Sequence, residues 1–287
     1  MATIQDTQPH FSLVMSTKDR TVEVVRFLES LGRQSDRSFE LIVSDQNNDD
    51  RLAPLLALFA KRFPLRVVHS TGGISRGRNA ALPLARGKII AFPDDDCWYP
   101  PHLLAAVRRL FEKHPAWDVV SGRSVDEAMH DTQGRWLDQV TVGDRSNVLR
   151  MGISYTIFAR ADVVTEAGPF DETLGVGAGT PWGSGEETDF LLRALAAGRK
   201  LIYTPELFVH HPEKVADYSR RARDRQFAYS RGLGRVLDKH RYTLAEAFSP
   251  LARPLAGAAL FMARGQCDRS LCYLRVFFGR SLGFLGH

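Results

Sequence analysis

Short apolar runs rich in valine and isoleucine alternate with segments of helical periodicity from residue 11 onward. Because these runs are apolar throughout, we expect strands that are buried on both faces, as in a mainly parallel sheet flanked by helices. The pattern therefore predicts an α/β fold. The expected strands are Phe11–Ser16, Phe39–Asp45, Arg66–Ser70, Lys88–Phe92, Asp118–Ser124, Ser154–Ala159 and Leu201–Thr204. The expected helices are the segment that carries Val22, Val25, Leu28 and Leu31, followed by Leu52–Phe63, Arg78–Ala85 and Leu103–Lys113.

The composition is that of an ordinary globular protein: of 287 residues, 44% are hydrophobic and 25% are charged, which excludes disorder, collagen and coiled coil. The three cysteines have no paired spacing, so we expect no disulfide framework and a reducing compartment. Residues 1–10 lack the layout of a signal peptide, and the longest apolar run, Pro254 to Ala263, is too short to span a bilayer. These observations predict a cytoplasmic protein.

Charge is distributed unevenly along the chain. Residues 212–287 contain 14 Lys/Arg against 6 Asp/Glu, whereas residues 1–211 contain 24 Lys/Arg against 27 Asp/Glu. The asymmetry predicts two parts with different surroundings, of which the second is basic. Its apolar segments Leu255–Ala263 and Leu271–Phe278 are interrupted by arginines. Either its helices pack on the first part, or they attach the protein peripherally to the anionic inner face of the cell membrane.

Three consecutive carboxylates follow one predicted strand. Lys88–Phe92 runs into Pro93-Asp94-Asp95-Asp96, at the strand end where open parallel sheets bind their ligands. Adjacent carboxylates repel one another, and a hard divalent cation such as Mg²⁺ or Mn²⁺, completed by substrate phosphates, would offset that repulsion. A solvated acidic turn is the alternative.

A second acidic cluster opens a predicted helix. Glu186-Glu187-Thr188-Asp189 follows a glycine-rich segment, residues 171–185, which is either a mobile loop or an irregular surface connection. Carboxylates in a first helical turn interact favourably with the helix dipole. Two adjacent carboxylates can also provide a general base, because crowding raises the pKa of one of them.

Over roughly residues 11–211, five segments of the chain resemble the motifs of the family 2 glycosyltransferases and occur in the same order. The members of this family are inverting enzymes of the GT-A fold, which has a Rossmann-like sheet. FSLVMSTKDR resembles the first strand and nucleotide-binding turn, and FELIVSDQNNDD the second strand with its acidic end. GGISRGRNAALPLARGKIIAFPDDDCWYPP is similar to the stretch that ends in the metal-binding DxD-type motif. GPFDETLG resembles the Gly-x-Phe-Asp-Glu segment, and GSGEETDFLLRALAAGRKLIYTPELFVHHP resembles the catalytic-base segment.

The resemblance implies a role for each matching position. The metal ligand would be Asp95, with Asp96 and His211 as further candidates, although Pro93 stands where the family has its usual first aspartate. The general base would be Glu187, with Glu186 in reserve because relatives often read Glu-Asp there. Contacts to the nucleotide would come from Thr17, Asp45, Arg76, Arg78 and Asp94. Contacts to the acceptor would come from Trp182 and Asp189.

The implied activity is transfer of a sugar from a nucleotide-diphosphate sugar to a hydroxyl of a glycan or lipid-linked acceptor in polysaccharide biosynthesis, with Mg²⁺ or Mn²⁺ as cofactor. The implied domains are a catalytic domain over residues 1–211, with a nucleotide-binding half at about 11–96 and an acceptor half at about 97–211, and a basic helical extension over 212–287.

Other classes fit the sequence less well. The first strand is not followed by GxGxxG, and no GxxxxGK[ST] string occurs, so dehydrogenases and P-loop enzymes are disfavoured. A non-catalytic protein that binds an anionic surface or nucleic acid would explain the basic extension and leave both acidic clusters unexplained. We therefore expect no nucleic acid partner.

Overall fold

A computed structural model describes residues 8–213 and 217–287. Part of the expectation about a signal peptide concerns residues 1–7, which lie outside the described residues. The described chain divides into two compact units. The first comprises residues 8–71, 77–169 and 193–213, and the second comprises residues 72–76, 170–192 and 217–287. The predicted division at residue 211 stays a prediction; in the structure, residues 170–192 group with the C-terminal helices.

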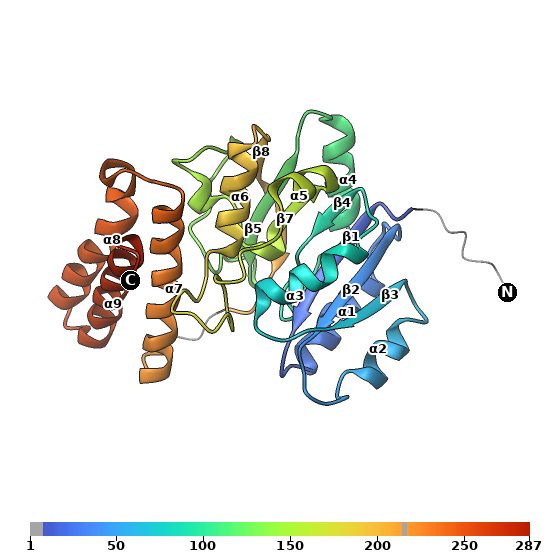
Figure 1. Cartoon of the computed structure of the whole chain (residues 1–287), viewed down its shortest axis with the longest axis horizontal. Helices are drawn as coiled ribbons and strands as arrows, with labels where there is room; N and C mark the ends of the chain where they lie inside the picture. The colour runs from blue at the N-terminus through green and yellow to red at the C-terminus, as the bar shows by residue number, and fades with distance from the viewer. Residues whose placement is uncertain (1–7, 214–216) are drawn as a thin grey trace. The chain divides into compact units, whose positions relative to one another are not determined.

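The first unit is built on an eight-stranded sheet in the described part of the chain, with the order β3-β2-β1-β4-β7-β5-β8-β6 (Figure 1). The strands are β1 (Phe11–Thr17), β2 (Phe39–Asp45), β3 (Leu65–His69), β4 (Ile89–Ala91), β5 (Val119–Val125), β6 (Thr141–Val142), β7 (Ile157–Arg160) and β8 (Leu201–His210). Neighbours pair in parallel except where β7 meets β4 and β5 and where β6 meets β8. The mainly parallel sheet predicted from the sequence is confirmed.

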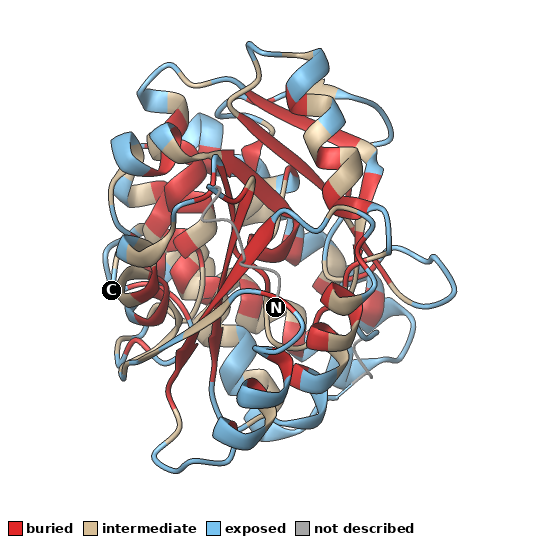
Figure 2. Ribbon diagram, turned by 90° about the vertical axis from the view of Figure 1, so that its right-hand side faces the viewer, coloured by how far each residue is buried: buried red, intermediate tan, exposed pale blue. Residues whose placement is uncertain are grey.

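Helices cover both faces of this sheet. The first-unit helices are α1 (Val22–Gly32), α2 (Ala53–Phe59), α4 (Leu103–Lys113), α5 (Ala161–Ala167) and the 3₁₀ turn η1 (Leu82–Leu84). On one face, Phe11, Leu13 and Met15 of β1 join a fully buried core with apolar residues of α1, α2 and α4. On the other face, Ile90 of β4 lies with residues of η1 and α5. Figure 2 shows most of the sheet in the colour of buried residues. Strands β1, β2 and β4 are buried along their whole length, whereas β3 and β6 are partly exposed.

One predicted strand begins in the wrong place. Residues Ser154–Thr156 form a 3₁₀ turn, η3, and the strand β7 starts only at Ile157 and runs antiparallel to its neighbours. The Thr156 hydroxyl accepts a hydrogen bond from the Ile153 backbone N–H at 3.1 Å and donates to the Ile153 carbonyl at 2.9 Å. This local bonding holds the turn in place of a strand ladder.

The second unit contains three long helices, α7 (Arg220–Lys239), α8 (Leu244–Ala263) and α9 (Cys267–Phe284), which Figure 1 shows in orange to red. It also contains the first residues of α3 (Ile74–Ala81) and of α6 (Glu186–Ala196). Close packing needs glycine where helices touch: a Cβ at Gly279 or Gly283 of α9 would meet the backbone of α7. The helical C-terminal part predicted from the sequence is present. Within the described residues, no helix is long and apolar enough to cross a membrane.

Candidate functional site

The acidic turn lies at the carboxyl end of β4, next to the end of β1. Asp94 forms a β-bridge with Ser16, so the turn continues the pairing of the two strands. The Asp94 carboxylate accepts hydrogen bonds of 3.1 Å from Arg78 Nη2 and from the Ser154 hydroxyl. Because the Arg78 side chain is almost completely buried, its charge is held in place rather than solvated. Arg78 and Asp94, two predicted nucleotide contacts, are thus direct partners.

Asp95 is the most deeply covered carboxylate of the turn. Its Oδ2 accepts a hydrogen bond of 2.8 Å from the Thr17 hydroxyl, and its Oδ1 one of 2.7 Å from Arg20 Nη1. Burial raises the pKa of Asp95 to about 6; the Arg20 charge and the Thr17 hydrogen bond counteract this, and Asp96 and Asp94 add to it. Ionised Asp95 is therefore costly in the absence of a further cation.

Asp96 bridges Arg20 and His211. Its Oδ1 lies 3.2 Å from His211 Nε2, and its Oδ2 contacts Arg20 Nη1. Burial alone would raise the pKa of Asp96 and lower that of His211, but their mutual hydrogen bond and attraction outweigh burial, so the pKa of Asp96 is lowered and that of His211 is raised. The imidazole also stacks on Tyr155 at 5.2 Å between ring centroids, which fixes its orientation. The structure thus brings His211 to the acidic turn from the end of β8.

The end of β2 forms the neighbouring wall of this site. Asp45 is buried, and its Oδ1 accepts hydrogen bonds from the backbone N–H of Asn47 at 2.9 Å and from Asn47 Nδ2 at 2.7 Å. Gln46 donates to the Ser16 hydroxyl at 2.6 Å, and a Cβ at Gly77 would collide with that hydroxyl. The glycine between Arg76 and Arg78 is therefore required by the close approach of α3 to β1.

The residues of the turn fit a divalent cation. Asp95 and Asp96 supply hard carboxylate oxygens and His211 an imidazole, a donor set that suits Mn²⁺ and Mg²⁺. The guanidinium of Arg20 already pairs with both carboxylates, so a metal ion bound by them would have to share or replace this contact. Across residues 8–213 and 217–287, no group of three or more His, Cys, Asp or Glu side chains is arranged to hold a metal by itself.

The two candidate bases stand at the start of α6 in the second unit. Glu186 is buried, and a Cβ at Gly175, whose φ is +100°, would approach its Oε2 to 3.0 Å. Glu187 is only partly covered. Of the two, Glu187 is therefore the more accessible to a substrate hydroxyl.

Asp189 does not face solvent. Its side chain is fully buried, and Oδ1 lies 2.8 Å from both Lys239 Nζ and His240 Nε2, at the end of α7. Lys239 also contacts Asp171 Oδ2 at 2.7 Å, so one lysine joins the GPFDETLG segment to α6. The predicted contact of Asp189 with an acceptor does not fit this burial. Nothing in the sequence pointed to Lys239 and His240, because they lie about 50 residues from their partners.

Trp182 and Arg76 are both engaged within the second unit. Arg235 of α7 lies over the Trp182 ring at 4.8 Å, and the Trp182 carbonyl accepts a hydrogen bond of 3.0 Å from the Gly175 N–H. Arg76 Nε pairs with Glu172 at 3.1 Å and is half exposed. Arg76 and Arg78 thus have different partners, although they lie two residues apart.

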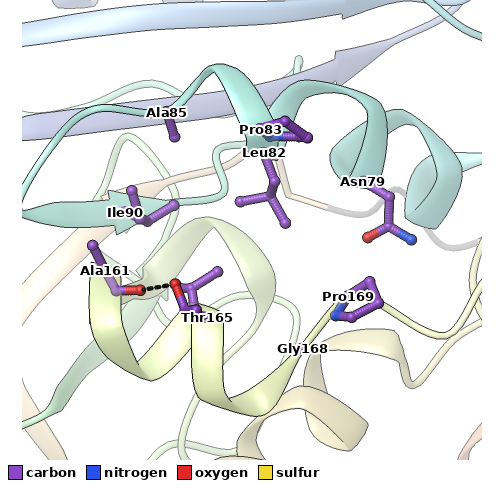
Figure 3. A pocket seen from close by; sticks show the side chains of 10 residues that line it. Asn79, Leu82, Pro83, Ala85, Ile90, Ala161, Thr165, Gly168 and Pro169 are labelled. Atoms are coloured by element: carbon purple, nitrogen blue, oxygen red, sulfur yellow. Dashed lines mark hydrogen bonds between the residues drawn. The ribbon is translucent and has the colours of Figure 1, made fainter.

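A hollow of about 290 Å³ in the first unit is separate from these side chains. Figure 3 shows that it is lined mainly by apolar residues of η1, β4 and α5, with Asn79 and Thr165 as its polar members. The Thr165 hydroxyl is already bonded to the Ala161 carbonyl at 3.0 Å. None of the acidic turn lines this hollow, so it does not extend the site.

A mainly parallel sheet with carboxylates, arginines and a histidine at its carboxyl edge is an open α/β arrangement, in which ligands bind beyond the carboxyl ends of the strands. Residues 12–161 match the model of glycosyl transferase family 2, which is more than half of the chain. The chain therefore belongs to glycosyl transferase family 2, and the resemblance predicted from its motifs is confirmed.

Curated relatives agree with this membership. The PGL/p-HBAD biosynthesis glycosyltransferase of Mycobacterium tuberculosis is 28% identical over 167 residues, which is 57% of this chain and 64% of the relative. A glycosyltransferase of Bacillus subtilis, YfnE, is 33% identical over 106 residues, which is 36% of this chain and 25% of that protein. The chain thus matches less than two thirds of the length of these relatives.

Solved structures share the fold at low identity. A mannosyltransferase from Pyrobaculum calidifontis, in complex with GDP-Man and Mn²⁺, superposes with a TM-score of 0.65 at 16% identity and covers 96% of this chain and 88% of that one. S. aureus TarS 1-349 in complex with UDP-GlcNAc gives 0.58 at 16% identity, with 95% and 92% covered. A longer TarS structure is matched over 49% of its length, with a TM-score of 0.60. These similarities confirm the predicted GT-A fold.

Proposed function

We propose that this chain is an inverting glycosyltransferase that moves a sugar from a nucleotide-diphosphate sugar to a hydroxyl of a glycan or lipid-linked acceptor in polysaccharide biosynthesis. The observation that carries the proposal is the partly buried acidic turn, in which Asp94, Asp95 and Asp96 meet Arg78, Arg20 and His211 at the carboxyl edge of the sheet. Family membership supplies the reaction class. The structures of TarS with UDP-GlcNAc and of the mannosyltransferase with GDP-Man and Mn²⁺ support a nucleotide-sugar donor.

In this proposal, the first unit binds the donor. Asp95 and Asp96, with His211, would hold Mg²⁺ or Mn²⁺, which supplies Lewis-acid stabilisation of the departing diphosphate. Arg78 would orient the phosphates, because a guanidinium matches phosphate oxygens in a bidentate manner. Thr17, Asp45 and Asp94 would contact the nucleoside, and Arg76 is a further candidate for the base or diphosphate.

Glu187 is proposed as the general base. It would accept the proton of the acceptor hydroxyl while that oxygen attacks the anomeric carbon and the bond to the diphosphate oxygen breaks. The nucleoside diphosphate leaves with the bonding electrons, and a single displacement inverts the configuration. Glu186 is the reserve base, and Trp182 remains a candidate contact for the acceptor.

The basic part of the chain behind residue 211 extends the proposal. This part contains 14 Lys/Arg against 6 Asp/Glu. Its positive charge supports a reversible peripheral contact with the anionic inner face of the cell membrane, where lipid-linked acceptors would be found.

Calorimetric titration tests the donor site. We expect UDP or GDP to bind in the presence of Mn²⁺ and to bind much more weakly without it. Asp95→Ala should abolish the metal-dependent part of binding while the fold survives, because the substitution removes a costly buried charge. Asp138→Ala, at an exposed aspartate of the same unit, is the matched control. Absence of any nucleotide binding, or wild-type metal dependence in Asp95→Ala, would overturn the assignment.

A further inference from the structure

Helices α8 and α9 form an antiparallel hairpin in the second unit. The Ser270 hydroxyl donates to the Ala258 carbonyl at 2.8 Å, and the rings of Phe261 and Tyr273 lie 5.2 Å apart. Arg280, near the other end of α9, donates a hydrogen bond to the Pro250 carbonyl. These contacts identify the side of each helix that packs against the other. The other sides of α8 and α9 can then be examined separately.

On α8, the remaining side is apolar along its length. Leu244, Phe248, Leu255 and Met262 recur at spacings of four and seven residues, so they lie on one face of the helix. Their exposed fractions are 73%, 70%, 40% and 52%. Ala258 and Phe261 are buried on the adjoining face. Helix α8 therefore has a second apolar face that no described part of the chain covers fully. Large apolar side chains such as Leu244 and Phe248 rarely gather on a surface that stays in contact with water, so this face suggests a binding partner.

On α9, a second apolar row is exposed. Leu271, Phe278 and Leu282 share one side, at exposed fractions of 44%, 55% and 37%, whereas Gly279 and Gly283 face α7. At about 100° per residue, the row lies roughly 110° around α8 and roughly 150° around α9 from the side that faces the partner helix. Because the helices are antiparallel, rotations in the same sense bring both rows to the same side of the hairpin. We call this side the outer face, comprising Leu244, Phe248, Leu255, Met262, Leu271, Phe278 and Leu282.

Charge determines which partner suits the outer face. Arg241 precedes α8, and Arg264 and Arg269 lie at the turn of the hairpin, all exposed. The chain behind residue 211 has 14 Lys/Arg against 6 Asp/Glu, so a second copy seated on the same face would bring two basic parts together. The hairpin carries exposed arginines at both ends against the exposed acidic residues Glu246 and Asp268, so its apolar strip instead matches a bilayer with anionic headgroups, where apolar side chains enter the acyl boundary and arginines remain at the phosphates.

We infer that the outer face of the α8–α9 hairpin is the surface that binds an anionic lipid bilayer. This inference rests on the proposed peripheral contact of the basic part with membrane, and it assigns that contact to particular side chains. The hairpin lies in the plane of the membrane–water interface and does not span the bilayer, since neither helix is long and apolar enough to cross a membrane.

Flotation of the full-length protein with phosphatidylcholine vesicles, with and without phosphatidylglycerol, tests the inference. We expect wild-type protein to bind only the anionic vesicles and to dissociate as salt rises. The double variant Phe248→Glu/Phe278→Glu should bind the anionic vesicles at least tenfold more weakly than wild type. It removes two aromatic side chains that would enter the bilayer, and it adds two negative charges that the anionic headgroups repel. Val22→Glu, at an 80% exposed apolar residue of α1, is the matched control and should bind as wild type.

The outcomes separate the two levels of the proposal. Failure of the wild-type protein to bind anionic vesicles, or equal binding to both vesicle types, would overturn peripheral attachment to an anionic bilayer altogether. Wild-type binding by the double variant would overturn the assignment to the outer face alone. A wild-type dimer in sedimentation equilibrium that the double variant loses would identify a second copy as the occupant. Circular dichroism and nucleotide titration of the double variant, both expected to be unchanged, verify that the first unit is intact.

Discussion

Glu186 and Glu187 are neighbours in the sequence and differ in how the second unit covers them. Glu186 is buried against the Gly175 region, whereas Glu187 is partly accessible. We expect Glu187→Gln to lower kcat by roughly 10²–10⁴ and to leave donor affinity nearly unchanged, because it removes a positioned base without altering size. Initial rates and nucleotide titration measure the two effects. A larger loss in Glu186→Gln would transfer the role to that residue, and wild-type rates in both variants would eliminate the segment.

Asp95 should make the cation-free protein less stable as pH rises. Its pKa in the folded chain is about 6, compared with 3.8 ordinarily, so folding favours its protonated form. That advantage is complete below about pH 4 and is lost as pH rises towards 6, at a cost of at most about 3 kcal/mol. Urea unfolding in EDTA should therefore show that Asp95→Asn gains stability relative to wild type at pH 7 and not at pH 4. An equal difference at the two pH values would contradict the assignment.

At the scale of elements, α7 is tied to α6 by charged side chains rather than by apolar packing alone. Lys239 and His240 meet the buried Asp189 carboxylate, and Lys239 also holds Asp171. This arrangement provides a physical reason for the grouping of residues 170–192 with the C-terminal helices. The segment with the candidate bases is therefore held by a helix that lies outside the residues matched by the family model.

Removal of the lysine should weaken the second unit. We expect Lys239→Met to lower the free energy of unfolding by about 1–3 kcal/mol, because Asp189 loses one of its charged partners and stays buried. Urea unfolding measures the loss, with Lys61→Met, at an exposed lysine of the first unit, as control. If Asp189→Asn costs as much in the Lys239→Met background as in wild type, the two residues are not coupled.

At the scale of the whole molecule, ligand binding should stabilise the unit that contains the acidic turn. A nucleoside diphosphate with Mn²⁺ at about 100 times its Kd would add roughly 2.7 kcal/mol to the stability of that unit. We expect its melting temperature to rise by several degrees with both ligands and by much less with the nucleotide in EDTA. A rise that is equal with and without metal would contradict the proposed role of the turn.

The fold class and the family follow from local features of the amino-acid sequence. Strands buried on both faces are mostly apolar, so their positions can be predicted from apolar runs, although β2 also buries Glu40, Ser44 and Asp45. The boundaries of Phe39–Asp45 and Leu103–Lys113 agree with the prediction. The acidic turn was visible because its three carboxylates are adjacent in the chain. Such local signals need no knowledge of the three-dimensional arrangement.

Which distant residues meet at the site depends on the three-dimensional packing of the elements. Arg20 and His211 reach the acidic turn from the ends of β1 and β8, and Ser154 reaches it from a 3₁₀ turn that the apolar pattern had assigned to a strand. The burial of Asp189 under α7 likewise depends on contacts across about 50 residues of chain. Contacts of this kind depend on which elements lie side by side, and hydrophobic periodicity specifies only which face of each element is buried.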